Sequence, residues 1–169
     1  MHPAYREWRQ TEWFDSGFLQ KVSAKQLKEF LQAFRPLSDE ASTAVQNSLF
    51  AGIKKPWHYL HTTGWMKRLL HEGVPDRNIS TLQQAVSAIR AKISWPDSEL
   101  VLLVYHQPNV YVTTWGRFLH YFQRGSMNLD NLIVSHPNNR DVVLFWEGSN
   151  PYLGKRGRRE LPCPPWDVK

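Results

Sequence analysis

Seven histidines give this chain its widest choice of chemistry, and their spacing limits what they could do. His58 and His61 lie three residues apart, so on a helix both imidazoles would project from one face and could hold a zinc ion. No third ligand is evident near them, and the chain contains no His-Glu-x-x-His motif. We therefore interpret the two residues as a surface or partly buried pair and predict no metal site.

A second set of histidines, His106, His120 and His136, belongs to the C-terminal part of the chain. If these three converged in one pocket, they could act as general acid and base in phosphodiester cleavage, with Asp130 and Glu147 as supporting carboxylates. The helical pattern around His120 turns its side chain towards solvent, and His136 falls in a predicted hairpin turn. We therefore rank a histidine enzyme third, below protein binding and nucleic-acid binding.

Other residue types that carry out catalysis give weaker signals. Cys163 is the single cysteine and lies between two prolines, so it lacks the helix N-terminus or neighbouring base that would activate a thiolate. Gly148, Gly154 and Gly157 do not form a phosphate-cradling loop between a strand and a helix. We expect no cofactor and no catalytic residue.

Basic and aromatic side chains gather between residues 146 and 159. Aromatic residues and arginine are the types that most often anchor protein interfaces. The same types bind nucleic acids, because cations neutralise phosphates while rings stack on bases. A solvated loop is the alternative for the basic run, and core packing is the alternative for the tryptophans. The predicted binding surface consists of Trp146, Tyr152, Lys155, Arg156, Arg158 and Arg159.

Helical signals dominate the first half of the chain, where we predict four helices between residues 23 and 93. Ser23 and Gln26 have the spacing of a capping box, and Ser80 and Gln83 repeat it before the fourth helix. The fourth helix carries a continuous apolar stripe at helical spacing: Leu82, Ala85, Val86, Ile89 and Ile93.

Strand signals dominate the second half. Leu100–Tyr105 is short, apolar and bounded by turn formers, as a buried central strand is. Asn109–Val112 fits either a hairpin partner of that strand or a lead into the next helix. Thr113 or Thr114 is predicted to cap an aromatic helix that ends at Gly125. An antiparallel meander follows, with strands at 132–134, 142–146 and about 151–154.

Length and composition describe an ordered protein of ordinary domain size. The chain has 169 residues, of which 41% are apolar, and eight are tryptophans, more than a core would be expected to hide. Its net charge of +6 favours an acidic partner. We predict a single α+β domain with a mainly helical part (1–96), a sheet-plus-helix part (97–160) and an extended surface tail (161–169).

The apolar runs, the first residues and the cysteine content together predict the cellular location. The longest apolar run is far shorter than the roughly 20 residues that a membrane span requires. The first residues do not form the apolar stretch of a secretory signal. A lone cysteine agrees with a reducing compartment. We therefore predict a cytoplasmic protein without a membrane span.

Several segments of the last third carry a resemblance to a known group of proteins. Residues 113–118, 132–134, 142–148 and 153–156, with a shorter echo at 35–38, resemble small bacterial proteins of unknown function that are sometimes found beside toxin genes and are similar to immunity proteins. The resemblance implies binding to a toxin or effector, and it supplies no catalytic residues. This chain is basic, whereas many inhibitors of nuclease toxins are acidic. The charge therefore speaks against a nuclease as the partner and leaves other toxins as candidate targets.

These observations lead to one functional prediction and one alternative. We predict a non-enzymatic protein of immunity or adaptor type that occludes an acidic surface of its partner. The alternative is a nucleic-acid-binding module that uses the same basic and aromatic residues.

Overall fold

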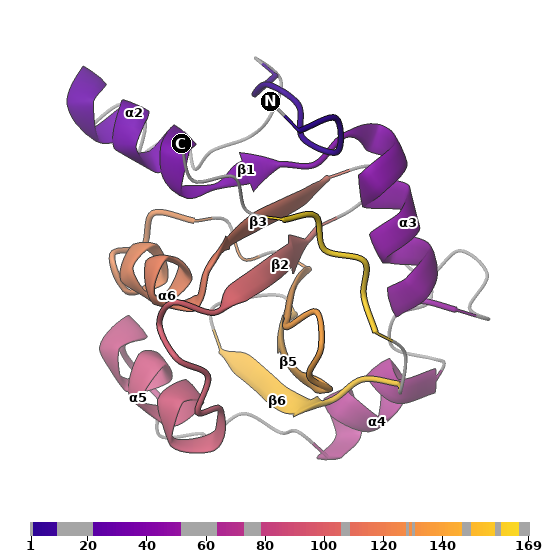
Figure 1. The fold of residues 1–169 in the computed structure, drawn as a ribbon. Helices are drawn as coiled ribbons and strands as arrows, with labels where there is room; N and C mark the ends of the chain where they lie inside the picture. The colour runs from indigo at the N-terminus through magenta and orange to yellow at the C-terminus, as the bar shows by residue number, and fades with distance from the viewer. Residues whose placement is uncertain are drawn as a thin grey trace.

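The computed structural model describes residues 2–9, 22–51, 64–72, 79–105, 109–127, 129, 131–146, 150–157 and 160–165. Within these ranges a six-stranded sheet lies between two layers of helices (Figure 1). None of the helices in this part of the chain combines the length and the apolar character that crossing a membrane requires.

Every neighbouring pair of strands in the sheet is antiparallel. The order across the sheet is β1 (Arg35–Pro36), β3 (Val110–Thr114), β2 (Leu100–Val104), β4 (Leu132–Ser135), β5 (Asp141–Phe145) and β6 (Pro151–Lys155). The last three strands are the predicted meander. The segment that the sequence left undecided is β3, which forms a hairpin with the predicted central strand β2.

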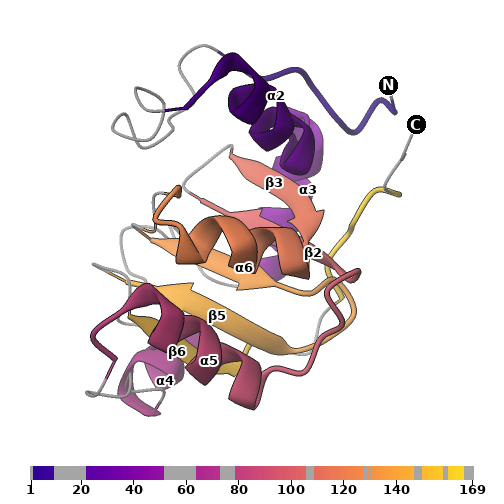
Figure 2. The same ribbon diagram turned by 90° about the vertical axis from the view of Figure 1, so that its left-hand side faces the viewer.

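Five helices are described: α2 (Ala24–Ala33), α3 (Asp39–Leu49), α4 (Gly64–Glu72), α5 (Leu82–Lys92) and α6 (Trp115–Gln123). Helices α2, α5 and α6 cover one face of the sheet, and α3 and α4 lie on the opposite face (Figures 1 and 2). The predicted α+β class is confirmed, with helices mainly first and the antiparallel meander last.

The strands are apolar on both faces because both faces are covered. Val101 and Leu103 of β2 point into the core beneath α2, α5 and α6. Leu102 and Val104 point into the core beneath α3 and α4. Successive side chains of a strand alternate between faces, so a strand buried on both sides reads as one continuous apolar run.

The predicted capping box is confirmed before α2, whereas the box before α5 lies one residue later than predicted. Ser23 caps α2, and Gln26 closes the capping box as predicted. The box before α5 lies one residue later than predicted, because the Thr81 side chain accepts the Gln84 amide hydrogen bond. Ser80 donates its hydroxyl to the same Gln84 side chain, at 2.9 Å, from outside the helix.

Thr113 and Thr114 have different roles at the start of α6. Thr114 is the N-cap, with its hydroxyl accepting a hydrogen bond from the Arg117 amide. Thr113 is fully buried in β3, and its hydroxyl donates to the Ala33 carbonyl oxygen at 2.7 Å. The end of α2 is thereby fixed to the sheet.

Two short segments add to the core in ways that the sequence did not indicate. Strand β1 is the edge strand of the sheet and pairs with β3. Next to β1, Tyr5 forms an isolated bridge with Leu37. The prediction of a surface arm from residue 161 is wrong at its first residue, because Leu161 is only 3% exposed. The Leu161 amide donates to the Pro137 carbonyl oxygen at 3.0 Å, which holds the segment against the meander.

The tryptophans of the described ranges serve packing more than the sequence predicted. Trp65, Trp95 and Trp115 are buried, while Trp8 and Trp146 are half-buried. The remaining three, Trp13, Trp57 and Trp166, lie outside the described residues.

Candidate functional site

The predicted binding surface is only partly exposed. Lys155 is exposed at the end of β6 and forms an ion pair with Asp141, with 3.0 Å between Nζ and Oδ1. Trp146 and Tyr152 are half-buried against the core beneath α3 and α4. Arg158 and Arg159 lie outside the described residues.

Arg156 was predicted on the surface, and that prediction is wrong, since the residue is 3% exposed. Its Nε donates to the Ser135 hydroxyl at 3.1 Å. One terminal nitrogen donates to the carbonyl oxygens of His136 and Pro137 at 3.2 and 3.0 Å. The guanidinium is therefore satisfied inside the protein, where it holds the β4–β5 connection in place.

A groove of about 450 Å³ lies beside Lys155, between α4 and β6. Among the described residues, its charged lining consists of the cations Arg68, Arg140 and Lys155 and the carboxylate of Glu72. Trp65, Leu69, Leu153 and Gly154 supply the apolar part of the lining. The groove thus combines an excess of positive charge with an apolar surface.

Local sequence and sheet register together build this groove. Arg68 lies on the exposed side of α4, while Trp65 and Leu69 of the same helix are buried. Arg140 comes next to the end of β6 because its carbonyl oxygen accepts the Arg156 amide hydrogen bond at 2.8 Å. Gly154 lets α4 approach β6, since a Cβ atom at this position would overlap Leu69 Cδ1.

The charges of this region act on the neighbouring buried arginine. Burial lowers the pKa of Arg156, and the positive charge of Arg140 lowers that pKa further. Arg68 is exposed and forms no ion pair with any described residue.

Of the three histidines considered as general acid and base, the structure describes His120 and His136, and each has contacts of its own. His136 donates through Nε2 to Glu99 at 3.1 Å, and its Nδ1 accepts the Asn138 amide hydrogen bond at 3.0 Å. Both ring nitrogens are therefore engaged. His120 is exposed on α6, where its ring contacts Tyr121.

The other residues considered for histidine chemistry fall outside the described residues. These are His58, His61, His106, Asp130 and Glu147. Among the residues that are described, no group of three or more metal-ligating side chains occurs.

Cys163 lines a second cleft, of about 410 Å³, together with Glu99 and His136. Burial raises the pKa of the Cys163 thiol to about 11. The thiol is therefore protonated at neutral pH, which does not suit a nucleophile.

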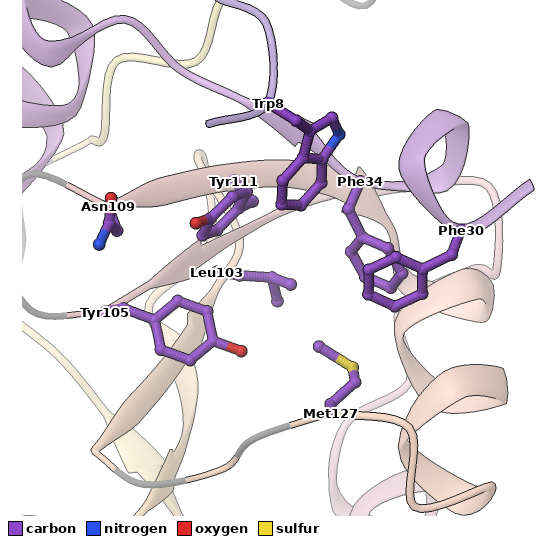
Figure 3. Close-up of a pocket in the computed structure, with 8 residues that line it drawn as sticks. All are labelled: Trp8, Phe30, Phe34, Leu103, Tyr105, Asn109, Tyr111 and Met127. Carbon is purple, nitrogen blue, oxygen red and sulfur yellow. The ribbon is translucent and has the colours of Figure 1, made fainter. Parts of the chain in front are cut away.

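A small third cavity, of about 40 Å³, lies on the other side of the sheet under the N-terminal segment (Figure 3). Its walls include five aromatic rings, those of Trp8, Phe30, Phe34, Tyr105 and Tyr111. The sequence gives no local signal for this cavity, because its residues come from several separate segments.

Comparison with protein-family models, with curated proteins and with solved structures gave no match for this chain.

Proposed function

We propose that the protein binds an acidic segment of another protein in the groove between α4 and β6. In this role it is an immunity or adaptor protein that occludes the surface of its partner. The observation that carries the proposal is the described lining of the groove, in which Arg68, Arg140 and the Asp141-paired Lys155 accompany the carboxylate of Glu72.

Charge complementarity supports an acidic partner. Arg68 and Arg140 are exposed, and a guanidinium can bind a carboxylate through two parallel hydrogen bonds. The net charge of +6 would accelerate the encounter with such a partner, and this acceleration would decrease with salt.

The apolar part of the groove supports a protein ligand. Leu153 is half-buried beside the cations, and the buried rings and methyl groups of Trp65 and Leu69 lie along the α4 wall. Protein interfaces combine an apolar centre with a polar rim, and arginine is enriched at their energetically important positions. An acidic segment with one apolar side chain matches both parts.

The same observations make nucleic acid the less favoured partner. Base stacking needs exposed ring faces, but Trp146 and Tyr152 are half-buried against the core. Arg156, which would have contributed to phosphate binding, donates its hydrogen bonds inside the protein.

A binding assay with defined probes tests the proposal. The full chain is titrated at low salt with a fluorescent glutamate-rich peptide that contains one leucine, and with the peptide in which glutamine replaces each glutamate. Arg68→Gln combined with Arg140→Gln is expected to weaken acidic-peptide binding roughly tenfold, the factor given by about 1.4 kcal/mol. Lys28→Gln removes one exposed charge from α2 and is the matched control for each single variant.

Each outcome distinguishes between the interpretations. Binding of the acidic peptide that weakens with salt and depends on Arg68 and Arg140 supports the proposal. Equal binding of both peptides, or an equal effect of the Lys28 control and the single groove variants, contradicts it. Tighter binding of single- or double-stranded DNA, lost in the same groove variants, would favour the nucleic-acid alternative instead.

A further inference from the structure

The positive charge of the described helices is concentrated on one side of the sheet. Helices α2, α5 and α6, counted with the C-cap of α6, carry the carboxylate of Glu29 and a larger set of exposed cations: Lys25, Lys28, Arg90, Lys92, Arg117 and Arg124. Helices α3 and α4 on the opposite face carry two cations, Lys67 and Arg68, against three carboxylates, Asp39, Glu40 and Glu72. The layer of α2, α5 and α6, which we call the cationic layer, therefore differs in charge from the other layer.

Helix α6 lies between α2 and α5 in the cationic layer (Figure 2). It contacts α5 directly, and its Tyr121 ring meets Phe30 of α2 edge-on, with 5.1 Å between the centroids. The apolar side of α6 faces the sheet, where Phe118 and Phe122 are buried. The helix is thus held on both flanks and from below, and it presents one fixed face to solvent.

The outward face of α6 carries cations at helical spacing. Arg117, His120 and Arg124 are exposed and lie at positions i, i+3 and i+7, so their side chains share one face of the helix. Seven residues span about 10 Å along a helix axis, which places the two arginines two turns apart. Gln123 is also exposed and is polar, and Arg124 forms no ion pair with any described residue.

Tyr121 lies among the charges of this face. Burial raises the pKa of its hydroxyl, and the negative charge of Glu29 raises that pKa further. The positive charges of Arg124 and Arg117 act in the opposite direction. Both arginines and Glu29 are therefore near the same side chain, which connects α6 with α2 electrostatically.

Ion pairs within the layer involve only part of its positive charge. Lys25 lies 4.0 Å from Glu29 on α2, and Arg90 of α5 lies 2.9 Å from Asp97 in the segment that follows this helix. Three further cations form no ion pair with any described residue: Lys28, Lys92 and Arg124. The described part of the layer thus keeps an excess of positive charge after its pairs are formed.

We propose that the cationic layer binds the phosphate backbone of a nucleic-acid duplex, with Arg117 and Arg124 at the centre of the contact. Arginine is well suited to phosphate because its guanidinium donates two parallel hydrogen bonds. A duplex carries a phosphate charge about every 1.7 Å of its axis, so cations on neighbouring helices can each meet one. Because α2 and α5 flank α6, the layer meets the backbone and not the base edges, and binding is independent of sequence.

The polar character of this face favours phosphates over other anionic partners. A helix that binds a membrane surface turns apolar side chains towards the lipid, whereas the apolar side chains of α6 are buried. A protein partner needs an apolar contact at the centre of its interface, and the exposed residues of α6 offer none. Helix α4 lies on the other face of the sheet, so this inference is independent of the acidic segment proposed for the α4–β6 groove.

The test measures the salt dependence of duplex binding. The full chain is titrated against a short fluorescent DNA duplex between about 50 and 200 mM salt, and we expect a dissociation constant of about 1–100 μM. Arg124→Gln should lower the slope of log affinity against log salt by about 1, and its combination with Arg117→Gln by about 2. Lys67→Gln removes one exposed charge from α4 and is the matched control, with an unchanged slope.

A variant that strengthens binding excludes damage to the fold as the cause. Glu29→Gln removes the carboxylate of the layer, so it should tighten duplex binding severalfold at low salt. A second duplex of different sequence should bind equally well. An RNA duplex of the same sequence shows which nucleic acid is preferred, and preference for either one supports a phosphate site.

Four results would overturn the proposal. They are the absence of duplex binding in this concentration range, equal effects of Arg124→Gln and Lys67→Gln, dependence of duplex binding on Arg68 and Arg140 alone, and a preference for two different DNA sequences that differs severalfold. Vesicles of phosphatidylserine and phosphatidylcholine in equal parts are titrated in parallel. Tighter binding to these vesicles, lost in the α6 variants, would assign the layer to a membrane and contradict the duplex. Circular dichroism confirms that each variant is folded.

Discussion

Gly154 and Leu69 meet so closely that a Cβ atom on the glycine would overlap Leu69 Cδ1. Helix α4 and strand β6 are in contact, and both residues line the groove between these two elements. Leu69 is 4% exposed, so its side chain has little space into which it could rotate. A side chain at position 154 would therefore require the Leu69 side chain to move.

Gly154→Ala is expected to lower the free energy of unfolding by about 1–3 kcal/mol, the usual cost of overpacking a buried contact. Gly157→Ala is the matched control, because a Cβ atom there would meet nothing within 4 Å. Its effect should stay within about 0.5 kcal/mol. Urea unfolding of both variants measures the difference, and equal stabilities would show that α4 adjusts at no cost.

Arg156 should act on stability more than on binding. Arg156→Met leaves the Ser135 hydroxyl, the buried Pro137 carbonyl oxygen and the partly buried His136 carbonyl oxygen without this donor, so we expect a loss of about 2–4 kcal/mol. Lys155→Met, one residue earlier, removes an exposed ion pair and should cost less than about 1 kcal/mol. Chemical denaturation of the two variants tests the contrast, which fails if the two losses are similar.

The thiol of Cys163 gives the protein a predictable response to alkaline pH. Its pKa is raised from 9.0 to about 11 by burial, so the unfolded chain loses this proton first as the pH rises. Stability should therefore be unaffected by this group below pH 9 and should decline between pH 9 and 11. Cys163→Ala should lack this part of the decline when unfolding is measured at pH 8 and pH 10.

Alkylation provides an independent check on the same thiol. Reaction with iodoacetamide should accelerate with a midpoint near pH 11 in the folded protein. In urea the midpoint should fall to the ordinary pKa of 9.0 from which burial raises this thiol. A folded-state midpoint equal to that in urea would be incompatible with a buried thiol.

Features encoded by neighbouring residues could be predicted from the sequence. The capping box of Ser23 and Gln26 needs residues only three apart, and the strands of the meander follow one another directly. The two-residue strand β1 was missed because its pairing with β3 depends on a partner far along the chain.

Features that depend on distant segments could not be predicted in the same way. Arg156 looked like a member of an exposed basic run, yet the register between β5 and β6 places it beside Ser135. Arg68 and Arg140 carry no local signal of proximity, and only the packing of α4 on β6 brings them to one groove. The rings of the aromatic cavity likewise come from the N-terminal segment, α2 and the β2–β3 hairpin.

The displaced cap of α5 leads to a final prediction. The Thr81 side chain accepts the Gln84 amide hydrogen bond at 3.2 Å, so Thr81→Ala leaves that amide unsatisfied and should cost about 1 kcal/mol. Ser80→Ala removes only an exposed hydroxyl that water can replace, and its cost should be below about 0.5 kcal/mol. Thermal and urea unfolding of the two variants decide which residue caps the helix. A larger loss for Ser80→Ala would place the cap where the sequence pattern first indicated it, one residue before its position in the structure.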